Sequence, residues 1–500
     1  MVDRLITSYP PPTAPGIYGI ISAAGPSVGP SGLGVVAIVG KSSFGPVGTA
    51  VQCGSPSAVQ TIFGDPSAVG REVAPVSTLA NLAREAAIGG AIGFVAVRVS
   101  GTTPGTTAKI TAGIMDSAST VVGQLAAASP GVFGNQLYCK IQTVLGSSTQ
   151  KELVVTKGAT VVQDTRFTSG AGEIDNLAAA TVGAPYAIFT KSASGSGTLG
   201  ALASTQMQGG ADPSGTSPTD YSNAFAALST WPWATLVTDS EDIAGVGNAV
   251  KSYVDTETLW GRFRTACVGE PTSVGVSTRY ANAALLNSAL VRYQGTGFTY
   301  PNGDGTYRND EGYLAAATDA GIMSTLTPGT SMTWRAIPGA TALVTGTPPY
   351  DEPTAIVNGM GYYKYSATLG IRTGAGISTL VNPATPPVWA IALNPGWKYL
   401  EHVATAFGLI GDIGDTWESM VANPDPVLRP PNTPAGRAAL IAAANRSAKQ
   451  YVDNSWIQSG DVIVDPAHPS TSNTAYFTFE NLVVALRAER LVLALPFGTP

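Results

Sequence analysis

The sequence predicts a multidomain protein of the mixed α/β class, with a discontinuous α/β core that both ends of the chain supply. Three observations predict this class. The first hundred residues alternate apolar runs with helical patterns, residues 101–205 change to strand-like alternation rich in Thr, Gly and Val, and helical periodicity returns in the last hundred residues. At about 100–200 residues per domain, 500 residues also suggest about three domains.

Residues 1–25 are expected to form an extended N-terminal arm. Prolines at positions 10–12 and 15 forbid a helix, whereas residues 17–21 (IYGII) can form one short strand. Such a strand can add to the sheet edge of a partner. A tail that packs on its own domain is the open alternative.

The first part of the core domain is expected at residues 26–100. Ser55 followed by Pro56 is typical of a helix N-terminus, and Gly64 is typical of a helix end. The expected order is strand 33–39, helix 55–64, helix 77–88 and strand 92–99. Buried-type strands that alternate with helices indicate an α/β arrangement.

Two inserted domains are expected between the halves of the core. Residues 101–205 predict a β-rich domain with strands at 136–144, 151–155, 159–162 and 186–190. Residues 206–380 predict a mixed α/β domain, with Asp220 as the cap of its first helix. Further helices are expected there at 243–260, 279–291 and 312–320, with a strand at 233–238.

The second part of the core is expected at residues 381–487, followed by a C-terminal arm at 488–500. Apolar residues recur with helical spacing over 398–413, and Thr433 followed by Pro434 predicts the start of another helix. The expected strands are 461–464, 476–480 and 491–495.

The charge composition excludes some functions and favours assembly. Charged residues make up 12% of the chain and the net charge is −6, with no cluster of Lys or Arg, so non-specific nucleic-acid binding is not expected. No apolar run reaches the ~18–20 residues of a membrane helix, and no secretory signal is apparent at the start. A surface with few charges suits extensive contact with other protein, because burying a hydroxyl costs less than burying a charge.

No constellation of residues predicts catalysis, a cofactor or a metal. Residues 195–200 (GSGTLG) match a dinucleotide-binding pattern, but they lie in a Ser/Gly-rich stretch without a surrounding βαβ unit. Ser27 lies in a GxSxG match flanked by prolines, where a nucleophile elbow needs a strand and a helix. His402 and His468 are the only histidines, and the three cysteines are widely spaced.

Several spaced motifs nevertheless point to one family. They are residues 15–18 (PGIY), 34–40 with 44–46 (FGP), 63–64 (FG), 89–90 (GG) before 94–99 (FVAVRV), 130–137 (PGVFGNQL), 209–212 (GGAD) with 220–221 (DY), and 488–491 (AERL). In their order and spacing they resemble the motifs of tail sheath proteins from contractile-tail bacteriophages and related injection machines. The resemblance covers nearly the whole chain.

The resemblance implies a structural role without enzymatic activity or cofactor. It implies a homo-oligomer of helically stacked rings around a tail tube, whose contraction drives the tube through the host envelope. The implied partners are other copies of the chain, the tail tube protein, and baseplate and tail terminator proteins, with no nucleic acid and no membrane insertion. The implied location is the phage tail of the virion, after assembly in the host cytoplasm.

Two groups of residues are candidate interaction sites under this resemblance. Strands exchanged between subunits would include Ile17, Tyr18, Ile20, Leu491, Val492 and Leu493. Contact with the tube is a hypothesis for Arg487, Glu489 and Arg490, for which a solvated or intramolecular ion pair is the alternative.

Two other classes of protein remain alternatives. A surface-layer or capsid-associated subunit fits the low charge and the Gly/Thr richness equally well, but not the terminal strand motifs. A serine hydrolase built around Ser27 is a more distant alternative, which loss of hydrolysis in a Ser27→Ala variant would reveal.

Overall fold

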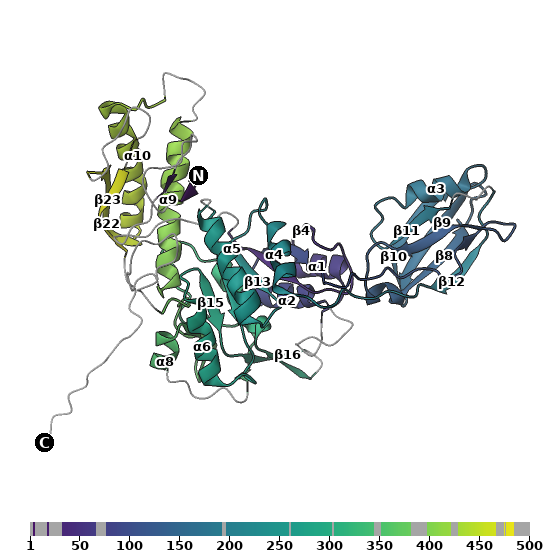
Figure 1. Cartoon of the computed structure of the whole chain (residues 1–500), viewed down its shortest axis with the longest axis horizontal. Helices are drawn as coiled ribbons and strands as arrows, with labels where there is room; N and C mark the ends of the chain where they lie inside the picture. Colours follow the sequence, from purple (N-terminus) through teal and green to yellow (C-terminus); the bar gives the residue numbers. More distant parts are fainter. Residues whose placement is uncertain are drawn as a thin grey trace. The chain divides into compact units, whose positions relative to one another are not determined.

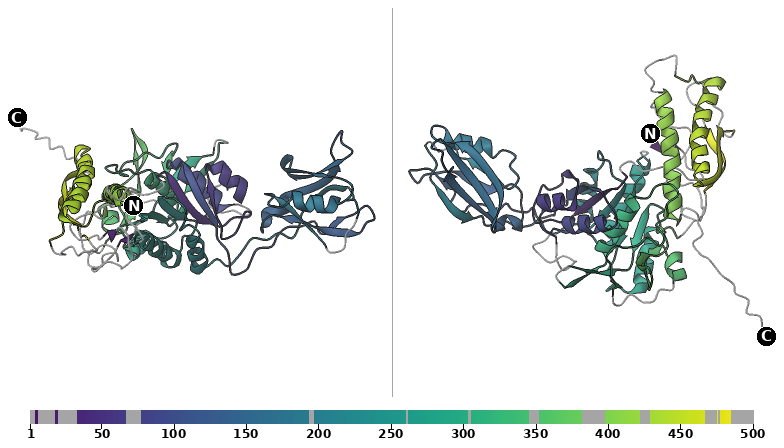
Figure 2. Two further views of the ribbon diagram at one scale, coloured as in Figure 1. Left: turned by 90° about the horizontal axis from the view of Figure 1, so that it is seen from above. Right: turned by 180° about the vertical axis from the view of Figure 1, so that it is seen from behind.

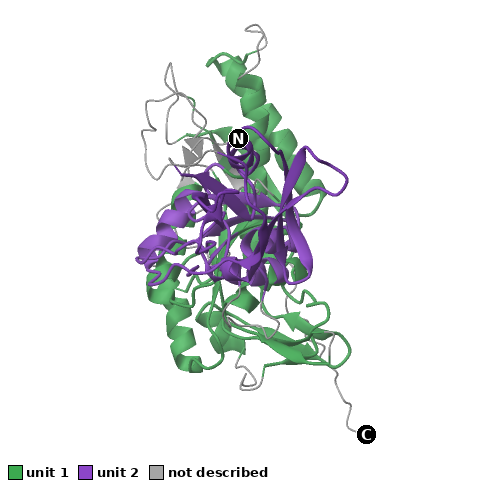
Figure 3. Ribbon diagram, turned by 90° about the vertical axis from the view of Figure 1, so that its right-hand side faces the viewer, with its two compact units in different colours: residues 1–37, 85–92, 231–500 green, residues 38–84, 93–230 purple. Residues whose placement is uncertain are grey.

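The computed structural model separates into two compact units, coloured green and purple in Figure 3. Unit 1 comprises residues 1–37, 85–92 and 231–500, and unit 2 comprises residues 38–84 and 93–230. The described residues are 4–5, 18–19, 33–66, 77–192, 197–259, 262–302, 305–344, 352–381, 398–421, 429–466, 475 and 477–484. The predicted mixed α/β, multidomain class is confirmed.

Unit 2 combines a small α/β portion with a β-sandwich. The α/β portion consists of β3 (Val35–Gly40), which starts in unit 1, β4 (Ala50–Cys53), α1 (Pro56–Phe63), α2 (Thr78–Ile88), whose end belongs to unit 1, β5 (Gly93–Arg98) and α4 (Pro218–Ala226). The sandwich consists of β6 (Ile114–Met115), β7 (Val121–Ala127), η1 (Val132–Gln136), β8 (Leu137–Thr143), β9 (Gln150–Lys157), β10 (Thr160–Thr168), α3 (Glu173–Ala180), β11 (Ala187–Lys191) and β12 (Leu202–Gln206).

The sandwich packs two antiparallel sheets over one apolar core. Their strand orders are β10-β9-β8-β12 and β11-β7-β6. Along β8, Cys139 and Ile141 are buried while Tyr138 and Lys140 are exposed, which is the period-two alternation of a half-buried strand. The strands predicted at 136–144, 151–155, 159–162 and 186–190 are all present, as β8, β9, β10 and β11.

Helix ends in unit 2 follow local capping chemistry. The Ser55 hydroxyl accepts from the Ala58 N–H at 3.1 Å and so starts α1, as predicted. The predicted cap of α4 is wrong. The helix starts at Pro218 with Ser217 as its N-cap, and Asp220 is the third helical residue, whose carboxylate accepts from the Ser217 N–H at 2.9 Å.

Unit 1 is built on a parallel sheet with the strand order β19-β15-β14-β13. Its elements before residue 380 are β1 (Arg4–Leu5), β2 (Tyr18–Gly19), β13 (Thr235–Thr238), η2 (Ile243–Gly247), α5 (Asn248–Leu259), β14 (Thr265–Gly269), α6 (Val276–Leu286), β15 (Val291–Gln294), β16 (Phe298–Pro301), β17 (Tyr307–Asp310), α7 (Tyr313–Ser324), β18 (Ala342–Leu343), α8 (Glu352–Val357), β19 (Met360–Gly361), β20 (Tyr363–Ser366) and β21 (Gly370–Thr373). Strands β13 and β15 and helices α5, α6 and α8 of this unit are labelled in Figure 1. Every residue of α7 is buried, so this helix lies in the core of the unit.

The helix predicted at 279–291 differs from the structure at both ends. Helix α6 starts earlier, at Val276, and ends at Leu286, where Asn287 takes a left-handed conformation with φ +40°. Val291 instead begins the buried strand β15. Since the residues between them are apolar or small, their pattern fits the end of a helix and the start of a strand equally well.

The last part of unit 1 pairs two long helices with a two-stranded sheet. Helices α9 (Leu400–Val421) and α10 (Pro434–Asp453) lie side by side, beside the antiparallel strands β22 (Ile457–Val464) and β23 (Phe477–Val484) (Figure 2). The Trp417 indole N–H donates to the Leu440 carbonyl at 2.8 Å between the helices. Thr433 caps α10 by accepting from the Gly436 N–H at 3.2 Å, as predicted.

Candidate functional site

A buried arginine lies where the sandwich of unit 2 joins its α/β portion. Arg98, the last residue of β5, is fully buried. Its Nη1 donates to the carbonyl oxygens of Gly45 at 3.0 Å and Pro130 at 2.6 Å. The nearest paired carboxylate is that of Asp212, with its Oδ1 3.6 Å from Nη2. Burial lowers the pKa of Arg98 to about 10, and the charge of Asp212 opposes this only in part.

Glycines allow the backbone segments of this junction to approach closely. Gly131 has φ +137°, and a Cβ there would lie 2.0 Å from the Ser43 carbonyl oxygen. A Cβ on Gly210 would lie 2.4 Å from the Gly131 carbonyl oxygen. The Asn135 side chain bridges to Gly210, accepting from its N–H at 2.8 Å and donating to its carbonyl at 2.9 Å.

Aromatic packing completes the junction. The Phe133 N–H donates to the Ser43 carbonyl at 3.2 Å, and the Phe133 ring lies 4.9 Å from that of Phe44. The motifs at 44–46, 94–99, 130–137 and 209–212 therefore meet at one place in unit 2. We name this place the Arg98 junction. It ties the sandwich to the α/β portion within the unit.

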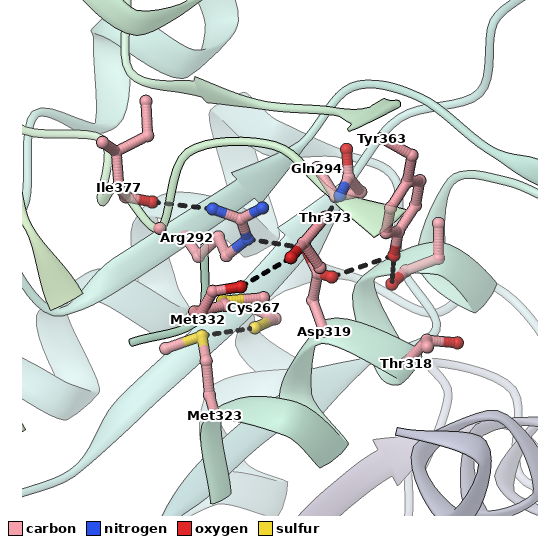
Figure 4. Close-up of polar contacts among 12 residues, drawn as sticks. Cys267, Arg292, Gln294, Thr318, Asp319, Met323, Met332, Tyr363, Thr373 and Ile377 are labelled. Atoms are coloured by element: carbon pink, nitrogen blue, oxygen red, sulfur yellow. Dashed lines mark hydrogen bonds and ion pairs between the residues drawn. The ribbon is translucent and has the colours of Figure 1, made fainter. Parts of the chain in front are cut away.

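Unit 1 contains a second buried arginine, in a network that Figure 4 shows. The Arg292 Nε on β15 lies 2.6 Å from Oδ2 of Asp319 on α7, and both side chains are fully buried. Gln294 donates to the same oxygen at 2.8 Å, and the Tyr363 hydroxyl donates to Oδ1 at 2.9 Å. Arg292 Nη1 also donates to the carbonyls of residues 375 and 377, at 3.1 and 3.0 Å.

The electrostatics of this Arg292 network differ from those of an active site. Burial alone would lower the pKa of Arg292, but the charge and hydrogen bond of Asp319 outweigh it and leave that pKa raised. Burial, followed by the charge of Asp319, raises the pKa values of Cys267 and Tyr363 well above their ordinary values. A neutral thiol and a neutral phenol without solvent access stabilise a core and offer no nucleophile to a solute.

The residues weighed for chemistry do not assemble into a site. Across the described part of the chain, no three His, Cys, Asp or Glu side chains are placed to hold a metal ion. His402 is buried in the first turn of α9, with Nε2 3.9 Å from Glu401, while Ser27 and His468 lie outside the described residues. After the GSGTLG match comes strand β12, so the helix that a pyrophosphate site needs does not follow it.

Few of the predicted assembly residues lie in the described part. Tyr18 belongs to β2, which pairs in parallel with β1 of the same chain. The other candidates lie outside the described residues: Ile17, Ile20, Leu491, Val492 and Leu493 for strand exchange, and Arg487, Glu489 and Arg490 for tube contact.

The strands predicted at 461–464 and 476–480 overlap β22 and β23, and the sheet that these two strands form was not among the predicted candidate sites. Its strands pair antiparallel, with register shifts next to Ser459. Within the described ranges this sheet has only two strands, so each strand has one edge that no described strand covers. Such edges present backbone N–H and C=O groups to which a further strand can pair.

The described architecture matches solved structures of sheath proteins. The chain is similar to the sheath tail protein of Desulfitobacterium hafniense, with a TM-score of 0.64 and 16% identity over 91% of this chain and 97% of that one. It is also similar to a sheath tail protein of Listeria innocua, with a TM-score of 0.63 and 16% identity over 91% of this chain and 96% of that one. The chain thus has the fold of tail sheath proteins.

The likeness is one of structure, not of sequence. No family model and no curated protein matches the chain at the sequence level. Among the described helices, none is both long and apolar enough to cross a membrane.

Proposed function

We propose that this chain is the structural subunit of a contractile sheath, which polymerises as helical rings around a tail tube and contracts to drive the tube through a host envelope. The observation that carries the proposal is the shared fold, which extends over 91% of this chain and 97% of the Desulfitobacterium hafniense sheath tail protein. Low charge also favours a protein whose surface is largely covered by copies of itself.

The two-stranded sheet of β22 and β23 suits strand exchange between subunits. Its edges offer main-chain donors and acceptors to the arms at residues 1–25 and 488–500 of neighbouring copies. In this proposal Ile17, Tyr18, Ile20, Leu491, Val492 and Leu493 lie in the exchanged strands. Main-chain hydrogen bonds suit a contractile lattice, because they survive rigid-body movement of the domains they connect.

The Arg98 junction and the Arg292 network support rigid-body movement. Each one cross-links segments that are far apart in sequence within its own unit. A subunit that keeps its internal packing can pass from a metastable extended lattice to a contracted one by exchanging contacts at its surface. The contacts between copies must be heterologous, since contacts that do not close build a filament.

The proposed partners are the tail tube protein and the baseplate and terminator proteins at the two ends of the sheath. Arg487, Glu489 and Arg490 are proposed to contact the tube. Reversing the charges of both arginines is expected to weaken co-assembly with the tube protein in a pull-down of the two purified components. Unchanged co-assembly would exclude this contact.

Electron microscopy of the purified chain tests the proposed function. Hollow, regularly striated tubes, formed alone or with the tube protein, are the expected result. Flat two-dimensional sheets would instead support a surface-layer subunit. Deleting residues 1–20 is expected to abolish tubes while the monomer stays folded by circular dichroism, and wild-type tubes from the truncated chain would contradict the exchange of N-terminal strands.

A further inference from the structure

Three large apolar side chains are exposed on one β-structure of unit 1. They are Trp334, Tyr365 and Leu369, with 51%, 62% and 55% of their surfaces exposed. Tyr365 lies on β20 of the β20–β21 hairpin, and Leu369 lies in its turn. The segment of Trp334 pairs with the hairpin's other strand, because the Trp334 N–H donates to the Thr373 carbonyl at 3.1 Å. The three side chains therefore come from adjoining backbone segments.

Trp334 holds a strained backbone conformation that its neighbours fix. Its φ is +61°, in the left-handed region that costs a residue with a side chain about 1–2 kcal/mol. Its carbonyl accepts from Arg372 Nη1 at 2.8 Å, so both its backbone groups are bonded to the strand beside it. Strain that surrounding contacts maintain at an exposed tryptophan is a reason to look for a function there.

Two arginines flank these side chains. Arg335 Nε donates to the Ser331 carbonyl at 2.9 Å, and Arg372 donates to the carbonyls of Leu369 and Trp334. Within the described ranges, neither guanidinium forms an ion pair with a carboxylate. We name the five residues Trp334, Arg335, Tyr365, Leu369 and Arg372 the aromatic–arginine patch. Trp, Tyr and Arg are the residues that dominate binding energy at protein interfaces.

The same chain carries a surface of opposite charge. On α9, Asp412, Asp415 and Glu418 are exposed at intervals of three residues, which places them along one side of the helix. The Asp412 carboxylate accepts from the Tyr451 hydroxyl at 2.7 Å, which fixes this end of the row. We name these three residues the acidic face of α9.

We propose that the aromatic–arginine patch of one copy binds the acidic face of α9 on another copy. The apolar side chains would supply the buried centre of the contact, and the paired charges would set its register. Because the two surfaces are different, the contact is heterologous and repeats from copy to copy without closing. This inference rests on the proposed polymer and names one of its subunit contacts.

A charge exchange tests the pairing directly. The double variant Arg335→Glu/Arg372→Glu is expected to raise the critical concentration for tube formation at least about tenfold, and Asp415→Arg/Glu418→Arg is expected to do the same. Combining all four substitutions in one chain is expected to restore assembly, because the charges are then exchanged between the surfaces. Sedimentation of tubes across protein concentrations gives the critical concentration.

Matched variants separate this contact from general effects. Lys109→Glu/Lys140→Glu makes the same change in net charge as the double arginine variant, at two exposed positions in unit 2, and Tyr307→Ala removes another exposed aromatic ring. Both are expected to assemble normally, whereas Trp334→Ala is expected to assemble poorly while it melts at nearly the wild-type temperature.

The outcomes distinguish the two proposals. The wild type forms tubes if the sheath function is right. If neither charge reversal then changes the critical concentration, or if the combined variant does not recover assembly, the proposed contact is overturned and the sheath function is unaffected. If the wild type forms sheets in place of tubes, the sheath function is overturned, and the two charge reversals and their combination, measured on the sheets, still decide the contact. A wild-type chain that stays monomeric at all concentrations, alone and with the tube protein, would overturn both.

Discussion

Unit 1 and unit 2 each contain an arginine whose side chain is completely buried, yet the pKa values of the two arginines shift in opposite directions from the ordinary value. The pKa of Arg292 is raised because the Asp319 carboxylate lies 2.6 Å away and is itself fully buried. The pKa of Arg98 is lowered to about 10 because burial prevails where the partners are carbonyls and a carboxylate at 3.6 Å. Both guanidinium groups are excluded from solvent, so burial alone does not set the direction of the pKa shift. The distance and the solvation of the counter-charge decide whether the pKa is raised or lowered.

The contrast extends to what holds each region together. The Arg292 network depends on charge, since one carboxylate receives three donors within 3 Å. The Arg98 junction depends on backbone shape, since glycines let three segments approach more closely than a Cβ would permit. Charge substitutions should consequently damage unit 1 more than unit 2.

The largest effect is expected from Asp319→Asn. This change leaves Arg292 charged and buried without a counter-charge, which costs about 3–5 kcal/mol of unfolding free energy. Urea denaturation measures the loss, and hydrogen exchange of the β15 amides places it in unit 1. A loss below about 1 kcal/mol would show that the carboxylate is not what stabilises the network.

A smaller loss is expected from Arg98→Met. The carbonyls of Gly45 and Pro130 lose the same donor, Arg98 Nη1, and the loss of this one donor is expected to cost about 1–3 kcal/mol in all. The Asp212 carboxylate, however, is about one-third exposed, so water can solvate it after the change. Urea denaturation measures this loss as well. A loss greater than that of Asp319→Asn would contradict the expectation that charge substitutions destabilise unit 1 more than unit 2.

Lys398 is a third cation whose pKa burial shifts, and it has no carboxylate partner among the described residues. Its ammonium donates to the Val357 carbonyl at 3.0 Å, and burial lowers its pKa to about 8. Between that value and the ~10.4 of an unfolded lysine, the unfolded chain binds more protons, so the unfolding free energy rises with pH. The slope is at most about 1.4 kcal/mol per pH unit for one proton.

The variant Lys398→Met is expected to remove this rise. Its gain in stability over the wild type should therefore be larger at pH 7.5 than at pH 10, as measured by urea denaturation at both values. An equal difference at the two pH values would mean that Lys398 keeps an ordinary pKa in the folded chain.

The smallest effect is expected from Asp212→Asn. In the wild type the Val132 N–H donates to the Asp212 carboxylate at 3.1 Å, and an asparagine oxygen can accept the same hydrogen bond. Only a partly exposed charge that lies 3.6 Å from Arg98 is lost. Such a pair contributes about 0–1 kcal/mol. A loss as large as that of Asp319→Asn would contradict the view that backbone shape, not charge, holds the Arg98 junction.

Local signals in the sequence were reliable where the chemistry is local. Ser55 before Pro56 and Thr433 before Pro434 each predicted a helix start that the structure has. The cap expected at Asp220 was wrong because Ser217 and Asp220 act together, and the sequence allows either to be assigned as the first residue. The end of the helix at Leu286 was missed because only the neighbouring strands of the sheet select β15.

The sequence by itself determined the mixed α/β class, most strands of the sandwich and the low charge that favours assembly, because periodicity, capping and composition act over a few residues. Only the tertiary structure decided that Arg292, Asp319 and Tyr363 share one network, and that Arg98 meets the carbonyls of residues 45 and 130. Those contacts join residues that lie between 27 and 53 positions apart. Their energies depend on burial and on distances of a few ångströms, which residue types and spacing along the chain do not contain.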